Sequence, residues 1–275
     1  MKKLLITIAM AAFTLASTVE AAQRPPLSMA SCNALLSYGA PVIKKENTTT
    51  ICREGYVTLY DNVAKIPVWT AWKITPEHVN GCVKRSNKFA ADRSLPQENQ
   101  STPYDYVGSG YDRGHMANDS HQSWNTQVEE DSFLMSNMVP QLAGLNRGAW
   151  KLLETSTGAW TVSTQHTLQV YAGPIYNVVT DKKIGKDQVD VPFAFYKIVI
   201  DTKTGTTLAF LFPHKENQGN DLSGMQVTVT TIEAASGVSF GVPAGHNKTL
   251  KEPAIPTDFK GAAAAKKTLC GMSDY

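Results

Sequence analysis

The residue types best suited to catalysis gather near the middle of this 275-residue chain. Residues 112–117 read Asp-Arg-Gly-His-Met-Ala, and residues 145–150 read Leu-Asn-Arg-Gly-Ala-Trp. His115 can take a proton near neutral pH, and the guanidinium of Arg113 can stabilise an oxyanion. The amide oxygen of Asn146 can bind a hard cation. Together these groups form a set suited to cleaving a phosphodiester bond.

Two further polar side chains, Asn137 and Glu154, belong to the same region. The spacing of apolar residues predicts a helix over residues 146–157. Glu154 follows Asn146 by about two helical turns, so both side chains can face one cleft. An amide as the only protein ligand leaves most of the coordination shell to water, which suits magnesium, and Glu154 would then act through a bound water. The plainer alternatives are a helix-capping Asn146 and an exposed Glu154 carboxylate.

The elements that must position these residues interleave without a linker, which predicts a single α+β domain. Runs rich in β-branched and aromatic residues predict strands at 57–62, 66–74, 133–135, 168–173, 192–200 and 207–212. Polar turns between the first two runs and between the last two predict hairpins. Residues 84–102 show neither the helical nor the strand periodicity of apolar residues, which predicts a loop. Residues 227–235 are ambiguous, because β-branched residues favour a strand while Gly237 could close a short helix.

The first 21 residues predict a signal peptide. Lys2 and Lys3 precede an apolar run at residues 4–17, which is short for a bilayer span, and small residues then allow cleavage after Ala21 or Ala22. The alternative is an N-terminal anchor helix. Cleavage would leave residues 22–275 as a mature protein that is secreted or periplasmic, with no further membrane segment.

Composition is that of an ordinary globular protein, with 42% hydrophobic and 18% charged residues. The net charge of +2 falls to +1 without the leader, because the leader carries two lysines and one glutamate. A polyanionic partner must therefore be inferred from a local site, since so weak a net charge does not demand one.

The four cysteines are an even number in a chain expected to be exported, which favours two disulfides. Their spacing fits neither a zinc site nor a redox motif. Sequence leaves three pairings open. Our working prediction is Cys32–Cys52 and Cys82–Cys270, the second of which would tie the C-terminus to the body. The alternative is that one pair stays reduced.

The order and spacing of these motifs resemble the DNA/RNA non-specific endonuclease family, which has the ββα-metal fold. The matching segments are 112–117, Asn137, 146–150 and Leu153-Glu154. The resemblance covers roughly residues 56–240. It implies a β-hairpin and a helix built on a central antiparallel sheet, with further helices and long loops. It also implies Mg²⁺-dependent hydrolysis of DNA and RNA to 5′-phosphorylated products, with Mn²⁺ as a possible substitute, by a monomer or homodimer.

The resemblance also implies a role for each matched residue. His115 would activate the attacking water, and Asn146 would bind magnesium directly. Glu154 would hold water in the metal shell. Arg113 would support the phosphate or the geometry of the metal site, and Asn137 would brace the site.

An arginine upstream of His115 should contact the transition-state phosphate. Arg85 is our choice, because residues 84–89 precede the motif in a similar setting. Arg93 is the second choice, and Arg147 is a further candidate because it adjoins Asn146.

One departure concerns Asn118, which stands where the family often has proline and puts the local loop geometry in doubt. A second metal site formed by His115, Asp119 and His121 is conceivable, but we favour a solvated polar loop. Four aromatic residues near the site could stack on bases or simply fill the core: Tyr104, Tyr106, Tyr111 and Trp124.

Two other function classes compete with an active nuclease. The first is a nucleic-acid-binding or uptake protein on the same fold that has lost catalysis, and the intact set of polar residues disfavours it. The second is a zinc hydrolase, which is disfavoured because the chain lacks a ligand-spaced motif such as H-E-x-x-H.

Overall fold

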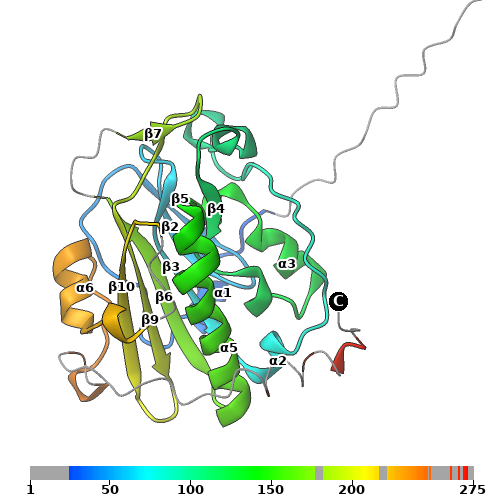
Figure 1. The fold of residues 1–275 in the computed structure, drawn as a ribbon, viewed down its shortest axis with the longest axis vertical. Helices are drawn as coiled ribbons and strands as arrows, with labels where there is room; N and C mark the ends of the chain where they lie inside the picture. Colours follow the sequence, from blue (N-terminus) through cyan, green and yellow to red (C-terminus); the bar gives the residue numbers. More distant parts are fainter. Residues whose placement is uncertain are drawn as a thin grey trace, which may run out of the picture.

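A seven-stranded antiparallel sheet forms the scaffold of the computed structural model (Figure 1), which describes residues 25–176, 182–216, 222–246, 248, 261, 266 and 269–271. Its strand order is β1-β2-β3-β6-β9-β10-β11. The strands are β1 (Thr48–Cys52), β2 (Val57–Asp61), β3 (Ile66–Ile74), β6 (Leu168–Ile175), β9 (Ala194–Asp201), β10 (Thr207–Pro213) and β11 (Gln226–Val227). The two predicted hairpins are confirmed as β2–β3 and β9–β10.

A separate two-stranded ribbon joins β4 (Asp112–His115) to β5 (Met138–Gln141), with His115 opposite Met138. Another pairs β7 (Lys183–Ile184) with β8 (Val189–Asp190).

The strand predicted at 133–135 is wrong. That run follows the helix α3 (Thr126–Ser132) and leads into a 3-10 turn, Met135–Asn137. Asn125 starts α3 by accepting hydrogen bonds from the N–H groups of Gln127 and Val128. The three apolar residues at 133–135 are buried, so their hydrophobicity reflects packing and not an extended backbone.

The helix predicted at 146–157 is confirmed and is longer than expected. It begins with α4 (Ala143–Leu145), continues through a π turn (Asn146–Trp150) that is kinked at Gly148, and ends as α5 (Lys151–Thr164). The ambiguous segment is the helix α6 (Val229–Ser236), with Gly237 at φ 72° after its end. Two short helices are α1 (Met29–Cys32) and α2 (Pro76–Val79).

Several short 3-10 turns lie between these elements. Besides Met135–Asn137, they are Asn33–Leu35, Gln97–Asn99, Pro103–Tyr106, Asp119–His121, Ser223–Met225 and Ala244–His246. The loop predicted at 84–102 holds one of these turns and a single β-bridge from Ala90 to Leu134, and is otherwise irregular as expected.

Two hydrophobic clusters cover the two faces of the large sheet. On one face, Trp72 and Phe195 pack with Trp150 and Trp160 from the long helix, which crosses the sheet in Figure 1. On the other face, residues such as Tyr171 and Ile198 pack with Val229 and Ile232 of α6. The predicted α+β class is confirmed: helices pack on both faces of an antiparallel sheet.

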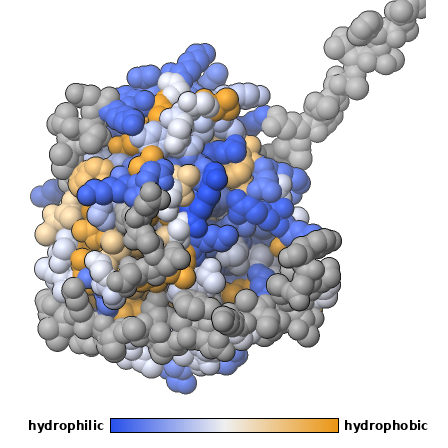
Figure 2. All heavy atoms as spheres, viewed as in Figure 1, coloured by the Kyte–Doolittle hydropathy of each residue, from blue (hydrophilic) through white to orange (hydrophobic). Residues whose placement is uncertain are grey.

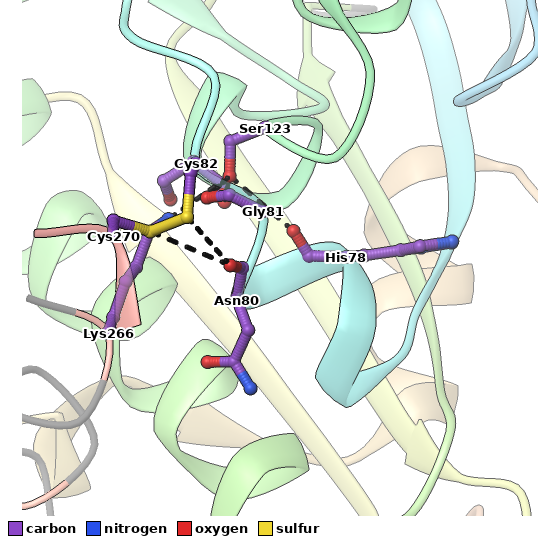
Figure 3. Close-up of a disulfide and its surroundings, with 8 residues drawn as sticks. His78, Asn80, Gly81, Cys82, Ser123, Lys266 and Cys270 are labelled. Carbon is purple, nitrogen blue, oxygen red and sulfur yellow. Dashed lines mark hydrogen bonds between the residues drawn. A yellow bond between two sulfur atoms is a disulfide. The ribbon is translucent and has the colours of Figure 1, made fainter. Parts of the chain in front are cut away.

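Both predicted disulfides are confirmed. Cys32 and Cys52 join α1 to β1 with their Cα atoms 5.8 Å apart. Cys82 and Cys270 form the second disulfide, with their Cα atoms 5.3 Å apart. Figure 3 shows this bridge beside Asn80 and Ser123. Lys266 adds a hydrogen bond from its Nζ to Ser123 Oγ at 3.1 Å, also drawn in Figure 3. The segment near the C-terminus is thus tied to the chain that follows α2.

The predicted signal peptide lies outside the described residues. Within the part of the chain that the structure describes, no helix is both long and apolar enough to cross a membrane.

Candidate active site

The ribbon β4–β5 and the helix that follows it form the predicted ββα unit. His115 ends β4, and the indole Nε1–H of Trp150 donates a hydrogen bond to the His115 carbonyl at 3.2 Å. This bond fixes the end of the ribbon against the helix. The structure thus places His115 on the hairpin and Asn146 on the facing helix.

The side chain of Asn137 is hydrogen-bonded to the segment just after His115. Its Oδ1 accepts the N–H of Ala117 at 2.9 Å, and its Nδ2 donates to the carbonyls of Ala117 and Ser132, both at 2.8 Å. The side chain is fully buried and does not line the cleft described next. Its effect on the site is therefore on the position of the backbone that follows His115.

A cleft of about 510 Å³ brings most of the predicted site residues together. Figure 2 shows hydrophilic side chains gathered where Figure 1 places β4 and the start of α5. The cleft is lined by Arg85, Arg113, His115, Asn118, Asp119, Ser120, Asn146, Arg147, Lys151, Glu154 and Thr155. Four basic side chains in one cleft suit an anionic ligand better than the small net charge of the whole chain suggests.

His115 is held neutral. Its side chain is 7% exposed, and burial lowers its pKa to about 4, with the charges of Arg85 and Arg113 adding to the effect against the opposing charge of Asp119. Nε2 is buried and makes no hydrogen bond with any described residue. The imidazole also packs edge-on against the ring of Phe133, at 4.9 Å between centroids. A neutral imidazole is the form that a general base requires, and the nitrogen that takes the proton must be one that cleft water can reach, which the buried Nε2 is not.

Asp112 orients Asn146. The Asp112 Oδ2 accepts a hydrogen bond from Asn146 Nδ2 at 2.9 Å, and the same carboxylate accepts two from Arg147, at 2.8 and 2.7 Å. Burial raises the pKa of Asp112, but these hydrogen bonds outweigh it and hold the pKa below its ordinary value. A carboxylate can only accept, so it fixes the nitrogen of the Asn146 amide toward itself.

The amide oxygen of Asn146 is thereby left for another partner. Among the described residues it accepts no hydrogen bond. The first residue before the helix is Leu142, so Asn146 does not cap it and the capping alternative is wrong. A neutral oxygen with no protein donor, on the wall of a polar cleft, fits a hard divalent cation.

Glu154 also lines the cleft, as predicted, and its side chain is 13% exposed. Its Oε1 pairs with Lys197 Nζ at 3.2 Å. Burial raises the pKa of Glu154, and Lys197 opposes that rise. The exposed-carboxylate alternative is therefore wrong, because Glu154 is partnered.

The arginines differ in position. Arg85 lines the cleft, pairs with Asp119 and lies over the Phe133 ring at 4.8 Å. Arg113 also lines the cleft and lies over Phe89 at 4.0 Å. Arg147 is 72% exposed at the cleft edge and is bound to Asp112. Arg93 lines neither this cleft nor the adjoining pocket, so the structure favours Arg85.

Comparison with known proteins agrees with this geometry. The sequence model of the DNA/RNA non-specific endonucleases matches residues 33–244. The chain belongs to the DNA/RNA non-specific endonuclease family.

Human mitochondrial endonuclease G is 31% identical to this endonuclease over 220 residues, which are 75% of this chain and 72% of that protein. A nuclease of Nostoc sp. is 32% identical over 197 residues, covering 67% of this chain and 70% of its own. A solved structure titled "Crystal structure of the EndoG/EndoGI complex: Mechanism of EndoG inhibition" aligns with a TM-score of 0.69 at 28% identity, covering 77% of this chain and 91% of that one. The protein is thus a phosphodiester hydrolase that acts on nucleic acid.

The conceivable second metal site of the endonuclease is not formed. His121 is 2% exposed and its Nε2–H donates to the Glu154 carbonyl at 3.1 Å, while Asp119 pairs with Arg85. Among the residues that the structure describes, no group of three or more His, Cys, Asp or Glu side chains is placed to hold a metal. The segment is polar, as in the interpretation that we favoured, but it is not a solvated loop throughout, because Asn118 is 4% exposed and His121 is 2% exposed.

The aromatic residues of the endonuclease divide into two groups. Tyr106 and Tyr111 line a pocket of about 330 Å³ that adjoins the cleft and shares Arg85, Arg113, Asn146 and Arg147 with it. Tyr104 lies in the 3-10 turn Pro103–Tyr106, which also carries Tyr106, and it is 85% exposed. Trp124 instead stacks on His78, with ring centroids 4.7 Å apart, and lines neither cavity.

Sequence reasoning missed the residues that hold the start of the long helix. Leu142 N–H donates to His214 Nε2 at 2.8 Å, and Gly144 N–H donates to Glu216 Oε2 at 2.6 Å. These two acceptors follow β10 and satisfy N–H groups that a helix start leaves without partners. No local pattern connects positions 72 residues apart in sequence, so nothing in the motif spacing could have found them.

Sequence reasoning also missed Lys197. One signal was present, because a lysine interrupts the apolar run of β9 at a position whose strand neighbours on the same face, Phe195 and Val199, are core residues. A charged residue at such a position needs a buried partner, and here the partner is Glu154.

Proposed function

We propose that the protein is an exported, Mg²⁺-dependent endonuclease that hydrolyses DNA and RNA without sequence preference and leaves 5′-phosphorylated ends. The observation that carries this proposal is the single cleft that holds His115, Asn146, Glu154, Arg85 and Arg113. The family supplies the reaction class, and the cleft supplies one group for each need of the reaction.

The metal would be held by Asn146 through its amide oxygen, and by Glu154 through water. The Asn146 oxygen is free of protein donors, and Mg²⁺ accepts a site with few protein ligands because it retains several waters. Bound there, the ion would neutralise phosphate charge during hydrolysis. Mn²⁺ shares the preference for oxygen ligands, so we expect it to substitute.

His115 would remove a proton from the attacking water. Its low pKa keeps it unprotonated throughout the neutral range, and its side chain lines the cleft in which the water would be activated. Arg85 and Arg113 would hold the phosphate oxygens and share the charge that develops on them. Contacts of this kind address the sugar-phosphate backbone and carry no base information, which is the physical reason for tolerance of sequence and sugar.

Export and the oligomeric state belong to the same proposal. The leader-like residues 1–21 and the two disulfides support an oxidising compartment, either the periplasm or the medium. We expect a monomer or a homodimer.

The test is digestion of plasmid DNA and of RNA by the purified mature protein, beside His115→Ala, with Mg²⁺ and with EDTA. We expect cleavage of both substrates, and loss of cleavage in EDTA and in the variant. End-labelling should then find 5′-phosphates. Binding without cleavage in any divalent metal would overturn the proposal in favour of an inactive binding protein.

A further inference from the structure

Lys197 is a charged side chain in the hydrophobic core. It lies in the middle of β9 and is 1% exposed. Its Nζ lies 4.0 Å from the ring centroid of Trp150 and 5.8 Å from that of Trp72. Burying an ammonium group is unfavourable unless the charge is paired, so the ion pair with Glu154 explains how a lysine is accommodated at this position.

That partner is the cleft carboxylate of Glu154. Lys197 lies on the core side of this carboxylate, and its Nζ donates a hydrogen bond to Glu154 Oε1 at 3.2 Å. The other oxygen, Oε2, makes no hydrogen bond with a described residue, and the side chain reaches the cleft. One oxygen is thus held from below while the second is left to the solvent of the cleft.

The two indole rings limit the freedom of this pair. Trp150 is 1% exposed and lies directly over the ammonium group, and its own N–H is bound to the carbonyl of His115. The cation–π contact and the close packing around it restrict the side chain of Lys197 where it holds the carboxylate. The Trp150 indole therefore contacts two parts of the site: the backbone carbonyl of His115, and the ammonium group of Lys197 that is paired with Glu154.

From this geometry we infer that Lys197 is a positioning residue of the nuclease site. It holds Oε1 of Glu154 and so leaves Oε2 toward the cleft, where it would hold water of the metal shell. The inference rests on the proposed function, since it assigns the residue that orients one member of the proposed metal site. Lys197 itself contacts neither substrate nor metal.

The test is a double-mutant cycle read by metal binding. Mn²⁺ affinity is measured by titration calorimetry without nucleic acid for the wild type, Lys197→Met, Glu154→Gln and the double variant. Lys197→Met removes the charge with little change in volume. Outer partners of metal sites typically contribute ten- to hundred-fold in affinity, so we expect a loss of that size in Lys197→Met.

The two substitutions should not add. If Lys197 acts through Glu154, Lys197→Met has little further effect in the Glu154→Gln background. An equal loss in both backgrounds would overturn the inference, as would wild-type affinity in a folded Lys197→Met protein. Lys197→Arg, which keeps a buried donor, should recover part of the affinity.

Separate control variants distinguish an effect on the site from a general effect on folding. Lys248→Met breaks another lysine–glutamate pair, with Glu233 of α6 at 2.9 Å, and should leave Mn²⁺ affinity unchanged. If Lys197→Met alone does not fold, the double variant leaves no unpaired charge and is compared with Glu154→Gln. The inference requires equal affinities in that comparison, and a further loss refutes it. Absence of Mn²⁺ binding by the wild type would instead be a failure of the proposed function.

Discussion

Replacing Asp112 with alanine should weaken metal binding while the fold persists. The Asp112 carboxylate holds the Asn146 amide nitrogen at 2.9 Å and so leaves the amide oxygen to the cleft. Without it, the amide can rotate and present nitrogen to the cation. A hydrogen bond to a charged group contributes about 1.5–3 kcal/mol, and about 1.4 kcal/mol corresponds to a factor of ten. The expected loss of Mg²⁺ or Mn²⁺ affinity is therefore roughly ten- to hundred-fold.

Asp112→Asn is the matched comparison. Its amide oxygen can still accept from Asn146, but it loses the charge that binds Arg147 through two hydrogen bonds. We expect this variant to lie between the wild type and Asp112→Ala. The assay is Mn²⁺ calorimetry, followed by plasmid nicking at increasing Mg²⁺ concentration. An Asp112→Ala protein that is folded, by circular dichroism, and needs no more metal than the wild type would refute this account of how Asn146 is oriented.

Three further predictions concern catalysis, acid stability and the smaller disulfide ring. His115→Ala should reduce the rate of cleavage by on the order of 10²- to 10⁴-fold, measured at saturating Mg²⁺, with Mn²⁺ affinity nearly unchanged, because the base is not a metal ligand. Burial lowers the pKa of His121 to about 3, so this group stabilises the fold above its ordinary pKa of 6.5 and the stabilisation is lost as the pH falls toward 3. The free energy of unfolding, from urea titrations between pH 7 and pH 4, should therefore fall less steeply in His121→Gln than in the wild type, and equal slopes would contradict the assignment. The paired variant Cys32→Ser/Cys52→Ser should lose about 3 kcal/mol of stability for its 20-residue separation, and intact mass with and without reductant should show no free thiol in the wild type.

The parts of the site that sequence predicted are those in which chemistry and local structure coincide. His115 and Asn146 are unusual residue types at the ends of short elements, so their motifs point to the cleft directly. The helix after Asn146 was predictable because its buried residues repeat with helical spacing. The strand runs of the large sheet were predictable because they are rich in β-branched and aromatic residues, which pack into the cores on both of its faces.

The parts that sequence did not predict depend on contacts between distant segments. The run at 133–135 is apolar because the core surrounds it, and apolarity alone does not separate a strand from a buried turn. Lys197 is hydrogen-bonded to Glu154, which is 43 residues away in the sequence, and His214 is hydrogen-bonded to Leu142, which is 72 residues away. Such contacts exist only once the sheet has brought β9 and β10 under the long helix.

The bridge between Cys82 and Cys270 makes a closed covalent loop with a separation of 188 residues, and every cleft residue from Arg85 to Thr155 lies inside it, as does Lys197. One cut in the backbone of such a loop, for instance at the exposed turn that carries Tyr104 and Val107, opens the loop without releasing a fragment. The two new ends remain parts of one molecule whose sheet pairings are intact. A protease must therefore cut twice before any piece of the catalytic machinery can diffuse away. For an enzyme proposed to work outside the cytoplasm, this link would keep a singly nicked molecule in one piece, in addition to its effect on thermodynamic stability.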